Sequence, residues 1–409
     1  MAKPGQKRTY AARVANTLVA VACLTVSHQA LAAKSKMANP SAAMSFLNVD
    51  AAGAKGNGST DDAAAIQGAF ARSRNVTCTA GKTYYVGSVV RISTDGTTLN
   101  ARGCKFAPHL KPSTSPMFDI EASSVTLNDL HVIAGGGGWA TFVGMSKPIS
   151  HIMFKDETCD GSDNPPMSGC DELGNVTDFK IDGWTDTATG YGLLQKSGTN
   201  SHGVSVTHFR ASDMYADLFE ENSVTGTSTD WVITNGTFEG SHGYPKPATE
   251  QRFAGFTTAD GITISSVNVQ HANGDAAVHL EGSAKNIKLV DDTFKDNLST
   301  GGADANVMYY NSANNIAASN IRCLYTSTGN ADFCFGGGAN SFSNELEFRN
   351  VFCQDSTGRH LFGCFELDFH AGNTRIIGGG GDGLLQFIQT KSTSNLTVRG
   401  PVVTNSKVQ

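Results

Sequence analysis

Short units recur about every 25 to 30 residues along most of this 409-residue sequence. Each unit contains one or two runs in which apolar and polar residues alternate, which is the period of a β-strand, and turns rich in Gly, Asn, Asp or Ser separate the runs. A repeat of this length with several short strands indicates a solenoid. A propeller blade needs roughly 40 residues, and a leucine-rich repeat needs a lattice of leucines with helices. The remaining interpretation is an all-β chain folded as a parallel β-helix.

The composition agrees with a turn-rich solenoid. The chain has 45 Gly and only 17% charged residues, whereas a coiled coil or helical bundle would contain far more Glu, Lys and Leu. A hydrophobic content of 39% is too high for a disordered chain. Each rung of a solenoid needs several tight turns, where Gly and Asn adopt backbone angles that other residues avoid.

The first 32 residues have the pattern of a secretory signal peptide. Basic residues come first, an apolar stretch follows at 14–26, and Ala30-Leu31-Ala32 resembles a cleavage site. The apolar stretch is shorter than the roughly 20 residues of a membrane span. A retained anchor and a lipoprotein modified at Cys23 are the alternatives. We predict a signal peptide at 1–32, a linker at 33–45 and a β-helix domain at 46–409, with a cap at 46–75 and rungs at about 76–405.

Removal of that segment would leave an acidic, exported chain. Residues 33–409 hold 27 of the 31 basic residues and all 37 acidic residues, a net charge of −10. Such a chain should not bind nucleic acid by general electrostatic attraction. We therefore expect no nucleic-acid partner, a secreted or periplasmic location, and no membrane association once the signal peptide is gone.

The remaining cysteines suggest disulfides. Their even number in an exported chain favours up to four bridges. None of them has CxxC spacing, so we expect no zinc site. Cys159 and Cys170 flank a loop rich in Gly and Pro, and we expect them to pair. The eight cysteines are Cys78, Cys104, Cys159, Cys170, Cys323, Cys334, Cys353 and Cys364.

Two of the cysteine spacings match the length of a rung. Cys323 precedes Cys353 by 30 residues, and Cys334 precedes Cys364 by the same number. Neighbouring strands lie about 4.8 Å apart, which is within the Cα separation of a disulfide. The spacing therefore favours bridges between stacked rungs, and local pairing of Cys323 with Cys334 and of Cys353 with Cys364 remains the alternative.

A short helix is predicted near the start of the β-helix domain. The segment Ser59-Thr60-Asp61-Asp62 predicts a helix start, with Ser59 and Asp62 at the spacing of a capping box. Ile66 and Phe70 would form one apolar face of the helix. Such a helix would cover the first rung, whose strand edge and core would otherwise face water.

The same stretch resembles the start of the pectate-lyase-like superfamily of right-handed β-helix proteins. That family has a G-A-K-G-D-G-x-T-D-D-T-x-A-I-Q-like motif and a P-x-G-x-Y-like segment. The counterparts here are residues 53–62 (GAKGNGSTDD), residues 65–67 (AIQ) and residues 80–84 (AGKTY), in which Ala80 replaces Pro. The resemblance implies a single-stranded, right-handed parallel β-helix that binds and cuts polysaccharides as a hydrolase or lyase. It includes tailspike relatives, so it allows a monomer or a homotrimer, and it transfers no catalytic residue.

Outward residues of stacked strands form columns along which a polymer can lie. Alignment of the repeated strands by their ends places Glu221 and Glu281 in one outward column, two rungs or about 9.6 Å apart. Inverting glycosidases hold their two catalytic carboxyls about 6.5–9.5 Å apart. We predict that Glu221 and Glu281 are catalytic, with His279 tuning or replacing one carboxyl. A slip of one residue in this alignment would reverse every facing.

Five further residues are predicted to bind substrate. Asp217 and Tyr309 would contact sugar hydroxyls, and Lys196 belongs to the same outward column as the glutamate pair. His242 and Tyr244 lie in a segment, at 240–252, that we expect to form a wall of the groove.

Together these features predict an exported glycoside hydrolase that acts on a polysaccharide with a carboxylate pair and needs no cofactor or metal. The first alternative is a polysaccharide lyase. A lyase would need a base, and Ca²⁺ or an arginine to neutralise a uronate, with Lys196 and Arg252 as the nearest basic candidates. The second is a non-catalytic carbohydrate-binding surface protein. The net charge of −10 disfavours a polyanionic substrate, and the fold alone does not choose among these functions.

Overall fold

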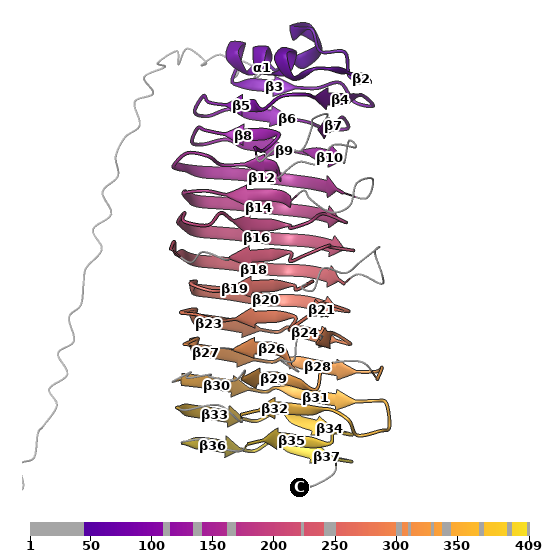
Figure 1. Ribbon diagram of the computed structural model, residues 1–409, viewed down its shortest axis with the longest axis vertical. Helices are drawn as coiled ribbons and strands as arrows, with labels where there is room; N and C mark the ends of the chain where they lie inside the picture. The colour runs from indigo at the N-terminus through magenta and orange to yellow at the C-terminus, as the bar shows by residue number, and fades with distance from the viewer. Residues whose placement is uncertain are drawn as a thin grey trace, which may run out of the picture. The chain divides into compact units, whose positions relative to one another are not determined.

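The computed structural model describes residues 45–108, 115–133, 141–161, 169–221, 225–240, 251–299, 305–309, 312–328, 331–337, 345–367, 372–390 and 395–406. The predicted signal peptide and almost all of the predicted linker lie outside these residues. Within them the chain is a parallel β-solenoid, as predicted, whose strands stack one above another from α1 (Ala63–Arg72) to β37 (Val402–Thr404) (Figure 1). A single turn of 3₁₀ helix, η1 (Val49–Ala52), precedes α1. In the described part of the chain, no helix combines the length and the hydropathy needed to span a bilayer.

One wall of the solenoid is a sheet of 12 short strands, which we call the short-strand sheet. Its strands are β5 (Val90–Ile92), β8 (Phe118–Ile120), β11 (Thr141–Gly144), β13 (Gly169–Leu173), β15 (Leu193–Gln195), β17 (Phe219–Glu221), β19 (Ala254–Phe256), β22 (Val278–Leu280), β26 (Ala305–Tyr309), β29 (Phe333–Gly337), β32 (Gly363–Glu366) and β35 (Gln386–Gln389).

The other walls belong to a sheet of 23 strands, which we call the long sheet. Its strands are β1 (Leu47–Asn48), β2 (Asn57–Asp61), β3 (Asn75–Thr77), β4 (Thr83–Val86), β6 (Thr98–Asn100), β7 (Lys105–Pro108), β9 (Thr126–Asn128), β10 (His131–Ile133), β12 (Ile149–Asp160), β14 (Val176–Thr187), β16 (Ser201–Ser212), β18 (Ser228–Glu239), β20 (Asp260–Gln270), β23 (Lys285–Val290), β24 (Thr293–Lys295), β27 (Asn314–Ser319), β28 (Arg322–Tyr325), β30 (Glu345–Arg349), β31 (Phe352–Asp355), β33 (Asn373–Ile377), β34 (Gly380–Asp382), β36 (Leu396–Arg399) and β37. Two short strands, β21 (Asn273–Gly274) and β25 (Leu298–Ser299), form a third sheet.

The long strands of the long sheet turn a corner at a residue with left-handed backbone angles. Only Gly, and less often Asn, Asp and a few others, adopt this conformation at low cost. In later rungs the same corner separates two strands, for example at Asn320 between β27 and β28, where φ is 57°. The corner residues of β12, β14, β16, β18 and β20 are Asp156, Gly183, His208, Asn235 and Ser266.

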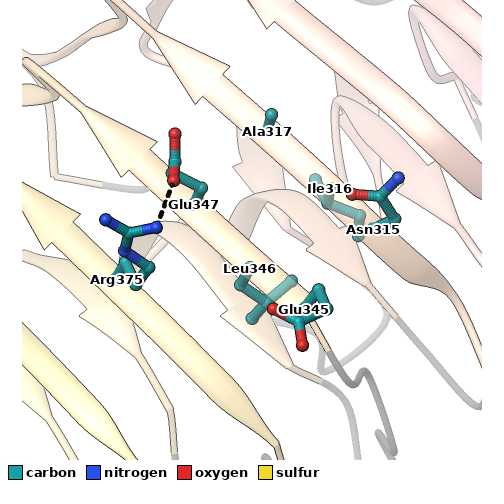
Figure 2. Close-up of a pocket in the computed structure, with 7 residues that line it drawn as sticks. All are labelled: Asn315, Ile316, Ala317, Glu345, Leu346, Glu347 and Arg375. Carbon is teal, nitrogen blue, oxygen red and sulfur yellow. Dashed lines mark ion pairs between the residues drawn. The ribbon is translucent and has the colours of Figure 1, made fainter.

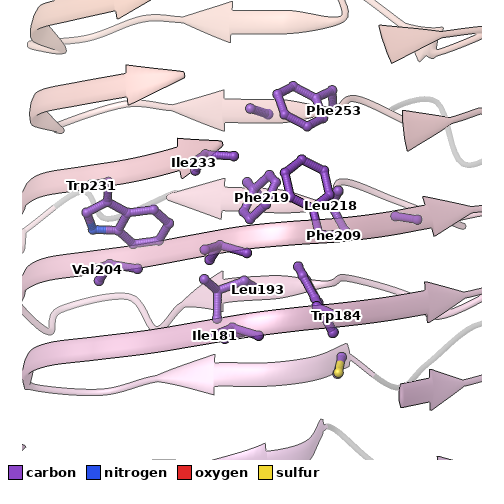
Figure 3. Packing of buried hydrophobic residues seen from close by; sticks show 14 of the residues in the cluster. Ile181, Trp184, Leu193, Val204, Phe209, Leu218, Phe219, Trp231, Ile233 and Phe253 are labelled. Atoms are coloured by element: carbon purple, nitrogen blue, oxygen red, sulfur yellow. The ribbon is translucent and has the colours of Figure 1, made fainter. Parts of the chain in front are cut away.

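The interior is filled by stacked apolar side chains, as Figure 3 shows for the middle rungs. Phe219 packs edge-on against Phe209 and Phe253, with ring centroids 5.5 and 5.4 Å apart. Trp184 and Trp231 are also buried in this core. Such aromatic stacking along neighbouring rungs stabilises the register between them.

The predicted N-terminal cap is present, although its helix starts differently from the prediction. Ile66 and Phe70 on α1 are buried, as expected. The capping box is wrong, because Ser59 belongs to β2 and the side chain of Asp62 makes no capping hydrogen bond. Asp62 instead accepts hydrogen bonds from the backbone N–H groups of Lys55 and Gly56, which tie the preceding loop to the helix.

The disulfides pair differently from the favoured prediction. The predicted bridge between Cys159 and Cys170 is present. The residues Cys323 and Cys353 do lie opposite each other on neighbouring strands, so the inferred register is right. Stacked bridges are nevertheless wrong, because opposed side chains of parallel strands run side by side and their Cβ atoms stay about 4.8 Å apart, beyond the roughly 3.5–4.5 Å that a disulfide spans.

Each of these cysteines instead meets a cysteine across the narrow interior of its own rung. The bridges are Cys323–Cys334 and Cys353–Cys364, with Cα atoms 5.7 and 5.6 Å apart. A fourth bridge joins Cys78 to Cys104. Four disulfides are consistent with an exported protein.

Candidate active site

Three consecutive strands of the short-strand sheet, β17, β19 and β22, carry a polar cleft on their outer face. The parallel ladder places Glu220, Gly255 and His279 directly opposite one another. Thr257 and Glu281 follow the ends of β19 and β22 on the same face. The cleft has a volume of about 190 Å³ and is lined by Glu220, Arg252, Gly255, Phe256, Thr257, His279 and Glu281.

Arg252 lies at the centre of the cleft and is held by Asp217. The carboxylate of Asp217 accepts a hydrogen bond from the backbone N–H of Arg252 at 2.9 Å. It also contacts the guanidinium Nε at 2.9 Å and a terminal nitrogen at 2.8 Å, a two-pronged ion pair. Both side chains are buried. Burial acts to lower the pKa of Arg252, but the charges of Asp217, Glu220 and Asp275 raise it above its ordinary value, so the arginine stays charged.

Glu220 approaches the same terminal nitrogen of the guanidinium that Asp217 contacts. Its Oε2 lies 3.5 Å from a terminal nitrogen of Arg252. Gly255 provides the room for this contact, because a Cβ at Gly255 would lie 2.7 Å from Oε2 of Glu220 and 3.3 Å from Oδ2 of Asp217. At Gly255 the floor of the cleft is therefore formed by backbone atoms alone.

His279 links the arginine to the outer carboxyl. Its Nδ1 lies 2.7 Å from a terminal nitrogen of Arg252 and 2.9 Å from Oδ2 of Asp275. One ring nitrogen cannot accept from Arg252 and donate to Asp275 at once, so the two contacts belong to alternative protonation states. Either state fixes the ring with Nε2 toward Glu281, 3.6 Å from its Oε2.

Asp275 stays ionised beside this histidine. Burial acts to raise the pKa of Asp275, but the hydrogen bond and charge of His279, followed by the charge of Arg252, outweigh it and hold this pKa below its ordinary value. A charged Asp275 orients the imidazole ring through the contact at Nδ1.

Glu281 is the most exposed carboxyl of the cleft, with 36% of its side chain accessible to solvent. Its Oε1 accepts a hydrogen bond of 3.2 Å from the hydroxyl of Thr257 on the neighbouring rung. With Nε2 of His279 near its other oxygen, Glu281 is held at the mouth of the cleft. It can therefore touch a bound molecule.

The predicted outward position of Glu221 is wrong. Glu221 lies opposite Phe256, which in turn lies opposite Leu280, so its column is one residue away from that of Glu281. Its side chain is fully buried and accepts hydrogen bonds from Thr257 and Thr258. Glu221 was predicted to face outward because its side chain is polar. In the structure the side chain points inward and binds the corner that follows β19.

Tyr309 is also placed differently from the prediction. It lies opposite Leu280 and points inward, fully buried, with its hydroxyl donating to the backbone carbonyl of Glu366 at 3.3 Å. Met308, not Tyr309, lies opposite His279. Burial raises the pKa of Tyr309 above its ordinary value. Tyr309 is thus a core residue.

The remaining predicted residues have mixed outcomes. Asp217 reaches the site, but as the partner of Arg252. Lys196 is outward and half-exposed, and it pairs with Glu172 at 3.0 Å rather than lining the cleft. His242 and Tyr244 lie outside the described residues. His279 and Glu281 do line one cleft.

Sequence reasoning missed Glu220, Asp275 and the central role of Arg252. A shared position along the chain could have identified Arg252 and Asp275. In a chain with so few charges, Asp217, Arg252 and Asp275 each stand two or three residues before a strand of the short-strand sheet. The register that brings these residues together depends on the rung lengths, which the sequence does not show directly.

The described residues also line hollows outside this cleft, of which we describe two. One, of about 250 Å³, is on the outer face of the long sheet over β27, β30 and β33, where Glu347 pairs with Arg375 at 3.3 Å (Figure 2). The other, of about 310 Å³, adjoins the polar cleft and is lined mainly by hydroxyl-bearing residues, among them Thr258 and Ser283. Neither hollow brings a histidine and several carboxyls together.

Potential metal ligands converge elsewhere in the described part of the chain. Among the described residues, three ligand atoms come within 4.8 Å of one another in two places: Glu157 with Cys159 and Cys170, and Cys323 with Cys334 and Cys353. In both places the sulfur atoms belong to disulfides. Among the described residues, the cleft carboxyls form no such group.

Comparison with known proteins identifies the class of fold. No protein-family model matches the chain, and no curated protein sequence matches it. Among solved structures, the catalytic domain of a GH87 α-1,3-glucanase in complex with nigerose aligns with a TM-score of 0.56 at 11% identity, over 88% of this chain and 65% of that one. ORF18 of Geobacillus virus E2 aligns with a TM-score of 0.53 at 16% identity, over 75% of this chain and 59% of that one.

The chain thus spans less than two thirds of the length of either structure. At these identities the likeness shows the fold. The parallel β-helix that the repeats predicted, and that the resemblance of the N-terminal segment implied, is confirmed.

Proposed function

We propose that the protein is an exported glycoside hydrolase that acts on a polysaccharide in the cleft over β17, β19 and β22. The observation that carries the proposal is the cleft itself, where two carboxyls, Glu220 and Glu281, and one histidine surround a buried arginine on the outer face of the solenoid. With about 190 Å³ it is smaller than the roughly 300–1,000 Å³ of pockets that enclose a whole ligand. It suits one segment of a longer polymer.

The two carboxyls match the requirements of glycoside hydrolysis. A carboxylic acid protonates the glycosidic oxygen as the bond to the anomeric carbon breaks, and a carboxylate activates the water that replaces it. We assign the acid to Glu281, which is exposed and next to His279, and the base to Glu220. Strands β17 and β22 are separated by β19 and lie about 9.6 Å apart. Glu281 follows by two residues the position opposite Glu220, so the backbones of the two glutamates are at least this far apart, which favours the inverting mechanism over the closer carboxyl pair of a retaining enzyme.

The charge of the cleft supports a neutral substrate. Asp217, Glu220, Asp275 and Glu281 outnumber Arg252, whose guanidinium already contacts three carboxylates and His279. Within the described part of the cleft, a uronate polymer would meet net negative charge and no basic group dedicated to its carboxylates. This arrangement favours hydrolysis over the lyase reaction. The fold is also that of an α-1,3-glucanase catalytic domain, a fold-level analogy that fits a neutral glucan.

Product analysis on a panel of neutral and acidic polysaccharides tests the reaction. We expect new reducing ends from a neutral polymer without the absorbance of an unsaturated sugar. That absorbance would instead identify a lyase. Binding without any cleavage would identify a carbohydrate-binding surface protein.

Substitution of Glu281 tests the site. We expect Glu281→Gln to lower kcat by at least about 100-fold, because general acid catalysis contributes roughly 10²- to 10⁴-fold. The matched control is Glu347→Gln, which changes a carboxyl in the hollow of Figure 2 and should leave activity unchanged. Full activity of Glu281→Gln, or loss of activity in the control alone, would place the site elsewhere.

A further inference from the structure

Glu221 is a buried carboxylate bound to a single corner of the next rung. It ends β17 and is fully inaccessible to solvent. Its Oε2 accepts hydrogen bonds from the backbone N–H groups of Thr257 at 2.9 Å and Thr258 at 2.7 Å, and its Oε1 accepts one from the hydroxyl of Thr258 at 2.7 Å. Hydrogen bonds to a charged acceptor are roughly twice as strong as neutral ones. The Glu221 side chain therefore fixes this corner, which we call the Thr257–Thr258 corner.

The outer side of the same corner faces the candidate catalytic carboxyl. The hydroxyl of Thr257 donates to Oε1 of Glu281 at 3.2 Å. The backbone carbonyl of Thr257 accepts the N–H of Ser283 at 2.9 Å, and a Cβ at Gly282 would lie only 2.5 Å from that carbonyl oxygen. The corner is thus packed closely against the segment that carries Glu281, so a shift of the corner would be passed to Glu281.

We propose that Glu221 is a positioning residue, whose buried carboxylate holds the Thr257–Thr258 corner so that the Thr257 hydroxyl fixes Glu281 at the mouth of the cleft. The proposal rests on the hydrolase function proposed above, with Glu281 as its acid. It gives Glu221 a role through another residue, without contact with substrate.

A similar clamp, by which we mean a buried carboxylate that binds the backbone of the next rung, occurs away from the cleft and provides a control. Asp119 on β8 is buried and accepts hydrogen bonds from the backbone N–H of Ser146 at 3.1 Å and from its hydroxyl at 2.8 Å. Strand β8 is four strands from β17 in the short-strand sheet, roughly 19 Å away. A change at Asp119 should lower stability without changing activity, because Ser146 does not line the cleft.

Two substitutions of Glu221 separate positioning from acid–base chemistry. Glu221→Gln keeps an oxygen for both backbone N–H groups, and the Thr258 hydroxyl can turn to the carbonyl of Gly226, 2.9 Å away. We expect this variant to keep kcat within about threefold of wild type. Glu221→Met removes every acceptor, and we expect kcat to fall at least about tenfold with KM little changed. Asp119→Leu should keep full activity.

The path through Thr257 is tested by a double-mutant cycle. We expect Thr257→Val, which removes the hydroxyl, to lower kcat as Glu221→Met does. Thr257→Ser, which keeps the hydroxyl, should have a kcat close to that of wild type. The double variant should be no worse than Glu221→Met alone, because both changes break one path. The threonine variants also decide the question if Glu221→Met fails to fold.

Several results would overturn the proposal. Loss of activity in Glu221→Gln equal to that of Glu281→Gln would make Glu221 itself a catalytic group. Full activity in Glu221→Met, or additive effects in the double variant, would leave the clamp with a purely structural role.

A readout without substrate keeps this proposal separate from the hydrolase proposal. Amide hydrogen exchange at Thr257 and Thr258 should be faster in Glu221→Met than in wild type or Glu221→Gln, and a crystal structure of Glu221→Met should show Glu281 displaced. If wild type cuts no polysaccharide, the hydrolase proposal fails, and these two measurements still decide whether Glu221 holds Glu281. Unchanged exchange with an unmoved Glu281 would refute the positioning role.

Discussion

At the scale of single residues, the candidate site depends on one position without a side chain. Gly255 sits between Glu220 and His279 in the ladder, and its missing Cβ leaves the space in which Glu220 and Asp217 both reach Arg252. The atom that a Cβ would meet first is a carboxylate oxygen at the end of a side chain, which can move. Adding a methyl group should therefore reduce activity more than it reduces the free energy of unfolding.

We expect Gly255→Ala to reduce kcat at least about tenfold while the free energy of unfolding changes by about 1 kcal/mol or less. The methyl group would push Glu220 away from Arg252 and fill the floor of the cleft. Gly68→Ala in α1 is the matched control, because a Cβ there meets no atom within 4 Å and Ala favours a helix. The measurements are steady-state kinetics and denaturant unfolding of both variants. An active Gly255→Ala enzyme would show that Glu220 is not needed.

At the scale of elements, the corner residues explain the composition of the chain. Asn350, Asn320 and Asp291 have positive φ on successive rungs, and their side chains are joined by hydrogen bonds of 3.1 and 2.8 Å. Asn is thus used for two properties at once, its tolerance of left-handed angles and its amide ladder between rungs.

Substitution of Asn320 separates these two properties. We expect Asn320→Ala to lower the free energy of unfolding by about 1–2 kcal/mol, because Ala strains the left-handed backbone and cannot join the ladder. Asn320→Gly should cost less, since Gly relieves the strain and loses only the ladder. Denaturant unfolding of both variants provides the test. Equal losses in the two variants would mean that the ladder, and not the backbone angle, governs the corner.

The elements also show what the sequence can predict and where it fails. Alternation and turn spacing predicted the parallel β-helix, and the spacing of Ile66 and Phe70 predicted the helical cap, because those features depend on local patterns. The predicted outward orientation of the side chain was wrong at Glu221 and Tyr309. The step from Glu221 to its partner Phe256 is 35 residues and the next step, to Leu280, is 24, so rung length varies too much for alignment by strand ends.

At the scale of the whole molecule, a cluster of three carboxyls lies inside the solenoid near one end of the core of β12 and β14. Glu157, Asp171 and Asp186 are buried near the Cys159–Cys170 bridge. Burial, followed by the charge of Asp171, raises the pKa of Glu157 well above its ordinary value. Burial raises the pKa of Asp171 to about 8. Burial, with the charges of Asp171 and Asp160, also raises that of Asp186, although Thr189 acts in the opposite direction.

These groups should make the protein more stable in mild acid than in mild alkali. The unfolded chain releases these protons near pH 4, whereas the folded chain keeps them to higher pH, and Asp171 keeps its proton to about pH 8. Between these values the folded state binds more protons, so the free energy of unfolding falls by about 1.4 kcal/mol per pH unit for each retained proton. His131, whose pKa is lowered chiefly by burial, acts in the opposite sense through its own titration.

The prediction is a free energy of unfolding that declines from pH 4 to pH 8, measured by denaturant unfolding across that range. Asp171→Asn has no proton to lose, so it should flatten the decline and raise stability at pH 8 relative to wild type. Asp182→Asn, at an exposed aspartate on the outer face of β14, should leave the slope unchanged. A profile that rises with pH, or that Asp171→Asn does not alter, would show that the buried carboxyls are already ionised in the folded protein.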